Sequence, residues 1–202
     1  MNRNAPLRIL GIDPGTRHVG YCVLEQRGFE LRRIASGCIK ADDNAVAFRL
    51  VSIHRGLVAV IAEHAPQAAA VETVFTSRNP KSAIAIGEGR GVAVLSAAEY
   101  GIEVTGYEPA LVKKAVTGSG RAGKEQVRQM VRVLLRLKEA PETDHESDAI
   151  AIAITHAIHC RPSNLAGGDR HPPLEPLRKR ALPESVLRQL PAGMTPKRRS
   201  RR

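Results

Sequence analysis

Aromatic side chains and cysteines are scarce in this chain of 202 residues. It has no tryptophan, three phenylalanines and three tyrosines, so a stacking platform for single-stranded nucleic acid is poorly supplied. The three cysteines, Cys22, Cys38 and Cys160, lie far apart and form no CxxC pair. This spacing argues against a disulfide scaffold or a zinc site, and we expect a protein of the reducing cytoplasm.

Long apolar runs are also absent. No segment approaches the roughly 18 apolar residues that are needed to span a bilayer. The N-terminus, MNRNAPLRILGID, has neither the apolar region nor the small-residue cleavage site of a signal peptide. We therefore expect no membrane partner, and the length suits one domain with an appendage.

Basic residues are in excess and unevenly distributed. The chain has 31 Lys and Arg against 20 Asp and Glu, and this formal net charge of +11 favours a polyanionic partner such as nucleic acid. Residues 1–160 hold 20 basic and 17 acidic residues, a net charge of +3, whereas residues 161–202 hold 11 and 3, a net charge of +8. Residues 161–202 also carry seven of the thirteen prolines, so we expect a disordered tail. It could be a polyanion-binding arm or only a solubilising extension.

The spacing of apolar residues predicts an α/β domain over residues 1–160. Strands are expected over 7–13, 18–25, 31–39, 67–72 and 102–107. Helices are expected over 44–64, 83–100, 109–116, 124–137 and 144–160. The short links between the first three strands predict an antiparallel meander. The whole order predicts a five-stranded mixed β-sheet flanked by α-helices.

Acidic residues end two of the predicted buried strands. Asp13 ends the first and Glu72 the fourth, and ligand sites of open α/β sheets form at the carboxyl ends of strands. On the last helix, His145 and Asp148 are three residues apart and share one face. Each residue alone could be an ordinary solvated residue. As a set, the three carboxylates would repel one another unless divalent cations neutralised them, so we predict a metal site.

Such a site suits phosphodiester hydrolysis. Two divalent cations held roughly 3.5–4 Å apart can activate water and stabilise the leaving oxygen. Mg²⁺ prefers oxygen ligands, but His145 adds a nitrogen donor that suits Mn²⁺ better. Asp144, one residue earlier, could join His145 or replace it.

The chain resembles the RuvC family of Holliday-junction resolvases, which belongs to the RNase H-like superfamily. The matching stretches run in family order from residue 7 to about residue 160, and they are ILGIDPGTRHVGYCVL, SGCI, AVETVF, RNPKSAIAIGEGRGVAV, VKKAVTGSGRAGKEQV and SDAIAIAITH. The resemblance implies an RNase H-like five-stranded mixed sheet and a homodimer. It implies nicking of two opposed strands of a four-way DNA junction, with two Mg²⁺ per subunit, in recombination and repair. It also implies RuvA and RuvB, a branch-migration complex, as partners.

The family's metal-binding positions fall on Asp13, Glu72, His145 and Asp148 of this chain. Many members carry aspartate at the third position, where this chain has histidine. The resemblance thus implies the same four metal ligands that the strand ends and the last helix indicate. Because one of them is a histidine, the set has a nitrogen ligand where many family members have an oxygen ligand.

A polar loop after Glu72 offers an aromatic residue to DNA. Phe75 lies there with Arg78 and Lys81, and an exposed aromatic beside cations can stack on an unpaired base at a junction. The resemblance credits Phe75 with this role. Phe75 could instead be a core residue at the end of the strand.

Basic residues flank the Gly-rich link TGSGRAG and are expected to contact phosphate. They are Lys113, Lys114, Arg121 and Lys124. A helix begins at Lys124 and offers its backbone N–H groups to an anion, and the resemblance assigns phosphate contact to Lys113 and Lys124. Further along, a row at spacing i, i+4 could follow a DNA backbone or only face water; it consists of Arg128, Arg132 and Arg136.

Several features also admit another interpretation. The small residues of the 83–100 helix could form the dimer surface that the resemblance implies, or pack within the molecule; they include Gly87, Gly89, Gly91, Ala93 and Ala97. The motif GIDPGT also fits the phosphate loop of actin-like ATPases, but the chain is too short for their two lobes. The chain could also be a non-catalytic junction-binding module, or an RNase H-like nuclease that acts on another nucleic-acid structure.

Overall fold

A five-stranded sheet organises the protein. The computed structural model describes residues 6–42, 44–73 and 80–159. The strands are β1 (Leu7–Asp13), β2 (His18–Arg27), β3 (Glu30–Lys40), β4 (Ala68–Glu72) and β5 (Glu103–Tyr107). Their order in the sheet is β3-β2-β1-β4-β5. The pairs β1–β2 and β2–β3 are antiparallel and the pairs β1–β4 and β4–β5 are parallel, which confirms the predicted mixed sheet and its meander.

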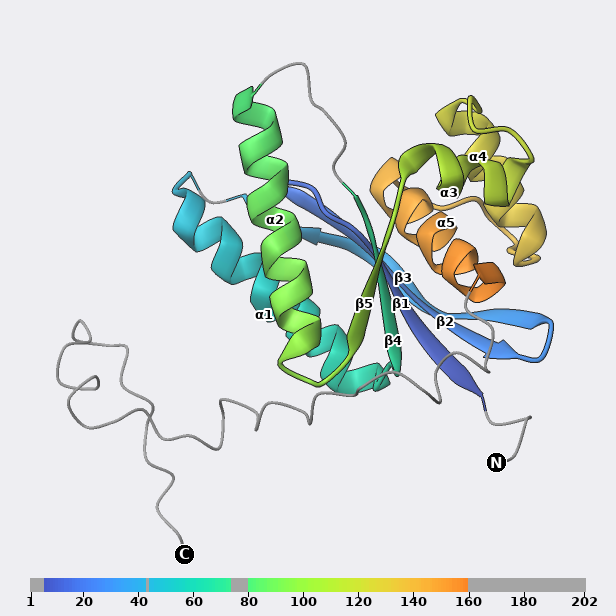
Figure 1. The fold of residues 1–202 in the computed structure, drawn as a ribbon, viewed down its shortest axis with the longest axis horizontal. Coiled ribbons are helices and arrows are strands. Elements are labelled where there is room, and N and C mark those ends of the chain that lie inside the picture. The colour runs from blue at the N-terminus through green and yellow to red at the C-terminus, as the bar shows by residue number, and fades with distance from the viewer. Residues whose placement is uncertain (1–5, 43, 74–79, 160–202) are drawn as a thin grey trace, which may run out of the picture.

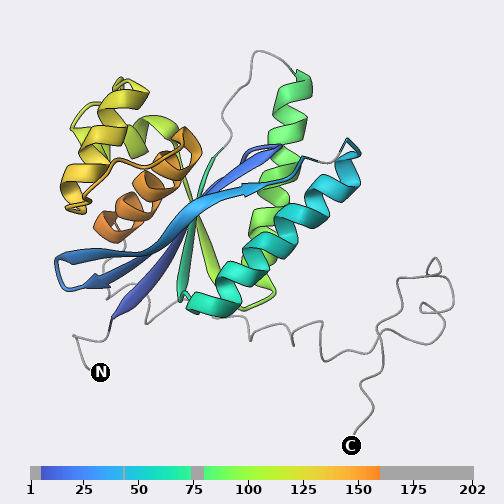
Figure 2. The same ribbon diagram turned by 180° about the vertical axis from the view of Figure 1, so that it is seen from behind.

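Helices cover both faces of the sheet. They are α1 (Val46–His64), α2 (Pro80–Ala98), α3 (Pro109–Thr117), α4 (Lys124–Leu134) and α5 (Asp144–His159). Helices α1 and α2 lie on one face, and α3, α4 and α5 lie on the other (Figures 1 and 2). None of these described helices is long and apolar enough to cross a membrane.

The strands send alternate side chains into two separate cores. Ile9 of β1 and its neighbour Ala68 of β4 pack with the α3–α5 layer, whereas Leu10 packs with α1 and α2. Because side chains alternate with a period of two, Asp13 and Glu72 fall on the same face as Ile9 and Ala68. Both strand-end acids therefore face the layer that contains α5.

Glycines let helix α5 lie directly on β1 and β2. A Cβ at Gly11 would collide with the carbonyl oxygen of Ala149, and a Cβ at Gly20 would collide with that of His145. A side chain at either position would therefore push α5 away from the sheet. The first of these contacts lies in the middle of β1, and the second brings the first turn of α5 next to the strand-end acids.

The helix predicted over 124–137 is shorter than expected. Helix α4 ends at Leu134, and Arg136 adopts a left-handed φ of 51°. The amide of Leu137 then donates a hydrogen bond to the carbonyl of Arg132, at 2.9 Å, which closes the helix end. Leu134, one of the apolar residues of the predicted amphipathic helix, is 44% exposed. The predicted helical row of three arginines is also wrong, because Arg136 lies beyond the helix.

Candidate active site

The four residues predicted as metal ligands come from three elements that meet at one edge of the sheet. Strands β1 and β4 are parallel with Ile12 opposite Val71, so the next residues, Asp13 and Glu72, end neighbouring strands. The beginning of α5 lies beside the end of β4 (Figure 1). Its first turns contribute the His145 and Asp148 side chains.

A short hydrogen bond joins the last helix to the first strand. His145 Nδ1 lies 2.6 Å from Asp13 Oδ2. A carboxylate only accepts, so Nδ1 carries the donated hydrogen, and in the neutral ring Nε2 keeps its lone pair. A metal-binding histidine commonly donates its second ring N–H to a carboxylate in this way. The hydrogen bond to Asp13 also raises the pKa of His145 above its ordinary value.

A second histidine, which the sequence did not predict for the site, stacks on this ring. The rings of His18 and His145 have centroids 5.8 Å apart and planes 16° apart. His18 opens β2, the strand that pairs with β1 and brings Gly20 opposite Asp13. The short turn after Asp13 could have indicated it, because a tight turn returns the next strand to the same sheet edge.

The other two carboxyl groups have raised pKa values. Burial, followed by the charges of Asp13 and Asp148, raises the pKa of Glu72 to about 7. Burial, followed by the charge of Asp13, raises the pKa of Asp148 to about 6. The ionised form of each acid is therefore destabilised by burial first and by neighbouring carboxylates second.

The residue types at the site fit a divalent cation, although their side chains do not lie close enough together to coordinate one ion. Within residues 6–42, 44–73 and 80–159, no three His, Cys, Asp or Glu side chains stand close enough to hold a metal as placed. The available donors are carboxylate oxygens and one imidazole nitrogen, which suit Mg²⁺ or Mn²⁺. A bound cation would also remove the repulsion that raises the pKa values of Glu72 and Asp148.

Lysines stand around the acids. The charges of Lys113 on α3 and Lys124 at the start of α4 oppose the rise in the pKa of Glu72. Lys124 Nζ also donates a hydrogen bond to Asp144 Oδ2, at 3.1 Å. Asp144 is therefore paired with Lys124, whereas His145 is the residue that contacts Asp13.

Of the remaining residues predicted to contact DNA, the structure describes some and not others. Lys114 on α3 and Arg121 before α4 are exposed. Lys81 belongs to the first turn of α2. Phe75 and Arg78 lie outside the described residues, as does the predicted tail over 161–202.

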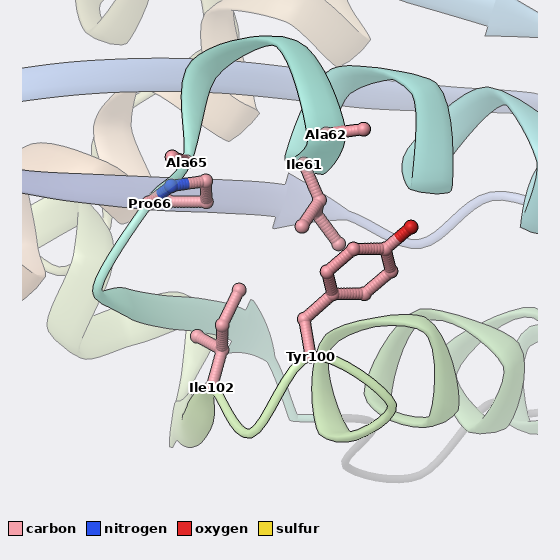
Figure 3. Close-up of a pocket in the computed structure, with 6 residues that line it drawn as sticks. All are labelled: Ile61, Ala62, Ala65, Pro66, Tyr100 and Ile102. Carbon is pink, nitrogen blue, oxygen red and sulfur yellow. The ribbon is translucent and has the colours of Figure 1, made fainter. Parts of the chain in front are cut away.

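Two surface pockets lie away from the acids. One, of about 240 Å³, lies between the ends of α1 and α2, where the Tyr100 ring and Ile61 turn toward each other (Figure 3). The other, of about 270 Å³, lies at the β2–β3 hairpin and is lined by Glu25, Arg27, Glu30 and Arg32. Neither is lined by a predicted metal ligand, so neither supports a small-molecule site at the acids.

The residues that begin α5 were also missed by the sequence predictions. The amide of Glu146 donates to Thr143 Oγ1, at 3.1 Å, and the amide of Glu142 donates to Glu146 Oε2, at 3.0 Å. The first contact is that of a capping box, which a Thr-x-x-Glu spacing before an apolar run indicates, whereas the Glu146 carboxylate accepts from the amide one residue before Thr143. The sequence TDHE contains that signal.

Comparisons with protein families and curated proteins agree on one family. The family model described as "Crossover junction endodeoxyribonuclease RuvC" matches residues 9–156. A protein of that name from Azorhizobium caulinodans is 47% identical over 163 residues, which span 80% of this chain and 96% of the relative. One from Pseudomonas putida is 46% identical over 160 residues, which span 79% of this chain and 91% of the relative.

Solved structures give the same result. The structure described as "T. thermophilus RuvC in complex with Holliday junction substrate" has a TM-score of 0.70 and 38% sequence identity, and the match covers 75% of this chain and 93% of that chain. The yeast mitochondrial Holliday junction resolvase Ydc2 has a TM-score of 0.53 at 12% identity, over 74% of this chain and 78% of that chain. The yeast match supports the fold alone.

Proposed function

The chain belongs to the RuvC family of crossover junction endodeoxyribonucleases, and from this membership we propose that it resolves Holliday junctions, the four-way junctions of DNA recombination and repair. The enzyme cuts two opposed strands by metal-dependent hydrolysis of phosphodiester bonds. The observation that carries the proposal is the meeting of Asp13, Glu72, His145 and Asp148 at one sheet edge of a RuvC fold.

The chain's own residues hold and orient the site. Carboxylate oxygens of Asp13, Glu72 and Asp148, with His145 Nε2, would hold the divalent cations. When bound, such cations polarise the scissile phosphate and lower the pKa of a bound water. Asp13 fixes the orientation of the His145 ring through Nδ1, and the stacked His18 ring restricts its rotation.

We propose two cations per subunit, with Mg²⁺ and Mn²⁺ both active and Mn²⁺ favoured by the histidine nitrogen. Replacing His145 with aspartate restores an all-oxygen set. We therefore expect His145→Asp to lower the ratio of the Mn²⁺ rate to the Mg²⁺ rate of junction cleavage. An unchanged ratio would show that the histidine does not select the metal.

Lysines beside the acids would bind the phosphates on either side of the cut. The charges of Lys113 and Lys124 both oppose the rise in the pKa of Glu72, which supports placing these two lysines near the acids. The exposed Lys114 and Arg121 extend this basic surface. We also propose Arg78 and Lys81 as phosphate contacts, from their positions in the sequence after Glu72.

Phe75 would stack on a base at the crossover, since it follows Glu72 by three residues. We expect Phe75→Ala to reduce the rate of junction cleavage by about 5- to 150-fold, which is what losing a base stack of about 1–3 kcal/mol gives, and to leave Mn²⁺ binding unchanged. Cleavage assays paired with metal titration test this. Equal losses of cleavage and metal binding would indicate a folding role instead.

A homodimer is proposed through α2. Its small residues divide between two faces: Ala93 is fully buried within the subunit, whereas a Cβ at Gly87 or Gly91 would meet only open space. Ile84 and Leu95 of the same helix are 64% and 52% exposed. This open apolar face would pair with a second copy, and the dimer would cooperate with RuvA and RuvB.

A labelled four-way junction tests the proposed function. We expect symmetrical nicks in two opposed strands with Mg²⁺ or Mn²⁺, no comparable cutting of a linear duplex with the same arm sequences, and no nicks by Asp13→Asn. Junction binding without nicks by the wild-type chain would leave only a binding module. Equal cutting of the duplex would indicate another RNase H-like nuclease.

A further inference from the structure

A buried carboxylate ties the first turn of α5 to the edge strand β3. Glu146 is 7% exposed. Its Oε1 accepts a hydrogen bond of 2.6 Å from Ser36 Oγ, and Arg33 Nη1 lies 3.6 Å from the same oxygen. Arg33 Nη1 also donates to Ser36 Oγ, at 3.2 Å, so three side chains form one connected group.

This group and the Asp13–His145 hydrogen bond hold α5 from opposite sides. The backbone of the turn rests on Gly20 of β2, the central strand of the meander. From that point Glu146 reaches β3 on one side, and His145 reaches Asp13 of β1 on the other. The first turn of α5 is therefore fastened to both neighbours of the strand on which it lies.

Helix capping accounts for the hydrogen bond of only one carboxylate oxygen of Glu146. The capping contact uses only Oε2, which accepts from the amide of Glu142. Burying a carboxylate is unfavourable unless its oxygens are paired, and an exposed glutamate would serve as well for a cap. The second oxygen thus makes a separate connection, to Ser36 and Arg33, across 110 residues of sequence.

We propose that Glu146 is a positioning residue of the metal site: through Ser36 and Arg33 it sets the rotation of the first turn of α5 and so holds His145 and Asp148 against Asp13. His145 and Asp148 share one helix face, so a rotation of the turn moves both together. The inference rests on the proposed function, because it presumes that these residues bind a cation.

Mn²⁺ binding to the full-length, DNA-free protein tests this role without any cleavage assay. Ser36→Ala removes the 2.6 Å hydrogen bond from β3 to Glu146 and leaves the Arg33 ion pair and the cap in place, whereas Thr143→Ala weakens the cap and keeps both contacts with β3. Ser36→Thr retains the hydroxyl and serves as the rescue. Free Mn²⁺ is counted by electron paramagnetic resonance, and folding is followed by thermal unfolding of the metal-free chain.

We expect Ser36→Ala and Glu146→Ala to weaken Mn²⁺ binding by about tenfold, the lower end of the effect of losing an outer-shell partner. Thr143→Ala should lower the melting temperature but leave Mn²⁺ binding as in wild type, and Ser36→Thr should restore binding. Wild-type binding by Ser36→Ala, or an equal loss in Thr143→Ala, would overturn the positioning role.

The failure of the proposed function looks different in the same experiment. If Asp13→Asn bound Mn²⁺ as tightly as the wild-type chain, the metal site itself would be misplaced, and both proposals would fall. If Asp13→Asn failed to bind Mn²⁺ while Ser36→Ala bound it normally, only the role of Glu146 would fall.

Discussion

At the residue scale, the site is a place where the folded protein is destabilised by its own charges. Glu72 and Asp148 are partly buried beside Asp13, and their pKa values rise to about 7 and about 6. Residues that bind cations or carry out chemistry often show such perturbed values. The consequence is that stability and function oppose each other at these positions.

Replacing Glu72 with glutamine should stabilise the metal-free protein. Between the ordinary pKa of 4.5 and the folded value of about 7, the folded chain keeps a proton on Glu72 that the unfolded chain has released. The free energy of unfolding therefore falls as pH rises through this window. Above about pH 7 the full destabilisation by ionised Glu72 is present. Allowing for partial exposure, we expect Glu72→Gln to raise the free energy of unfolding by about 2 kcal/mol near pH 8.

Urea unfolding from about pH 4 to pH 8 measures this difference in the absence of metal. Glu63→Gln, at a side chain that is 75% exposed, is the matched control and should change little. The gain for Glu72→Gln should disappear below about pH 4.5. A loss of stability in Glu72→Gln at high pH would contradict the unfavourable environment of ionised Glu72 that we describe.

Single residues of the site were predictable to different degrees. Asp13 and Glu72 end strands that the apolar pattern reveals, and His145 and Asp148 share a helical spacing. The short turn after Asp13 is the local signal for His18, but no local signal assigns the contact of Glu146 with β3, because that contact depends on which strands lie next to α5. That information resides in the strand register and not in local sequence.

At the element scale, helix ends show where local sequence misleads. Ala65 follows the last residue of α1 and Gly118 follows the last residue of α3, and both are in the left-handed region, with φ of 47° and 80°. A glycine such as Gly118 indicates a helix end with a left-handed residue. Arg136 does not, which is why the helix over 124–137 was predicted three residues too long.

The two helix ends give a matched pair of substitutions. A left-handed backbone conformation costs an L-residue about 1–2 kcal/mol, and glycine avoids this cost. Glycine is more flexible in the unfolded chain, however, which offsets about 0.5–1 kcal/mol of the gain. We therefore expect Ala65→Gly to stabilise the protein by about 0.5–1 kcal/mol and Gly118→Ala to destabilise it by a similar amount.

Chemical denaturation of the two variants measures both effects, and junction cleavage serves as a control that should not change. If both substitutions shifted stability in the same direction, backbone strain at these caps would not be the cause.

At the scale of the whole molecule, the net charge of +11 divides unequally. Residues 1–160 carry +3, because their 17 acidic residues nearly balance their 20 lysines and arginines, and residues 161–202 carry +8. The topology of the first part was predictable because each element has its own apolar period and its own turn signals. No such period exists in residues 161–202, and their role stays a prediction.

We predict that the basic end of the chain contributes to DNA affinity through phosphate contacts. Replacing the five basic residues of the final KRRSRR with glutamine should flatten the dependence of junction affinity on salt, by about 0.9 in logarithmic slope for each phosphate that is no longer neutralised. Lys113→Gln, beside the acids, should lower the slope by about 0.9 alone. An unchanged slope in the tail variant would favour a solubilising role.

A supercoiled plasmid that extrudes a cruciform tests whether the acids of this sheet edge cut junctions. Paired nicks across the junction convert this plasmid to the linear form. We predict linear product from the wild-type chain with Mg²⁺ or Mn²⁺. Glu72→Gln should bind the cruciform but give no linear product. Linearisation by Glu72→Gln at the wild-type rate would contradict the account.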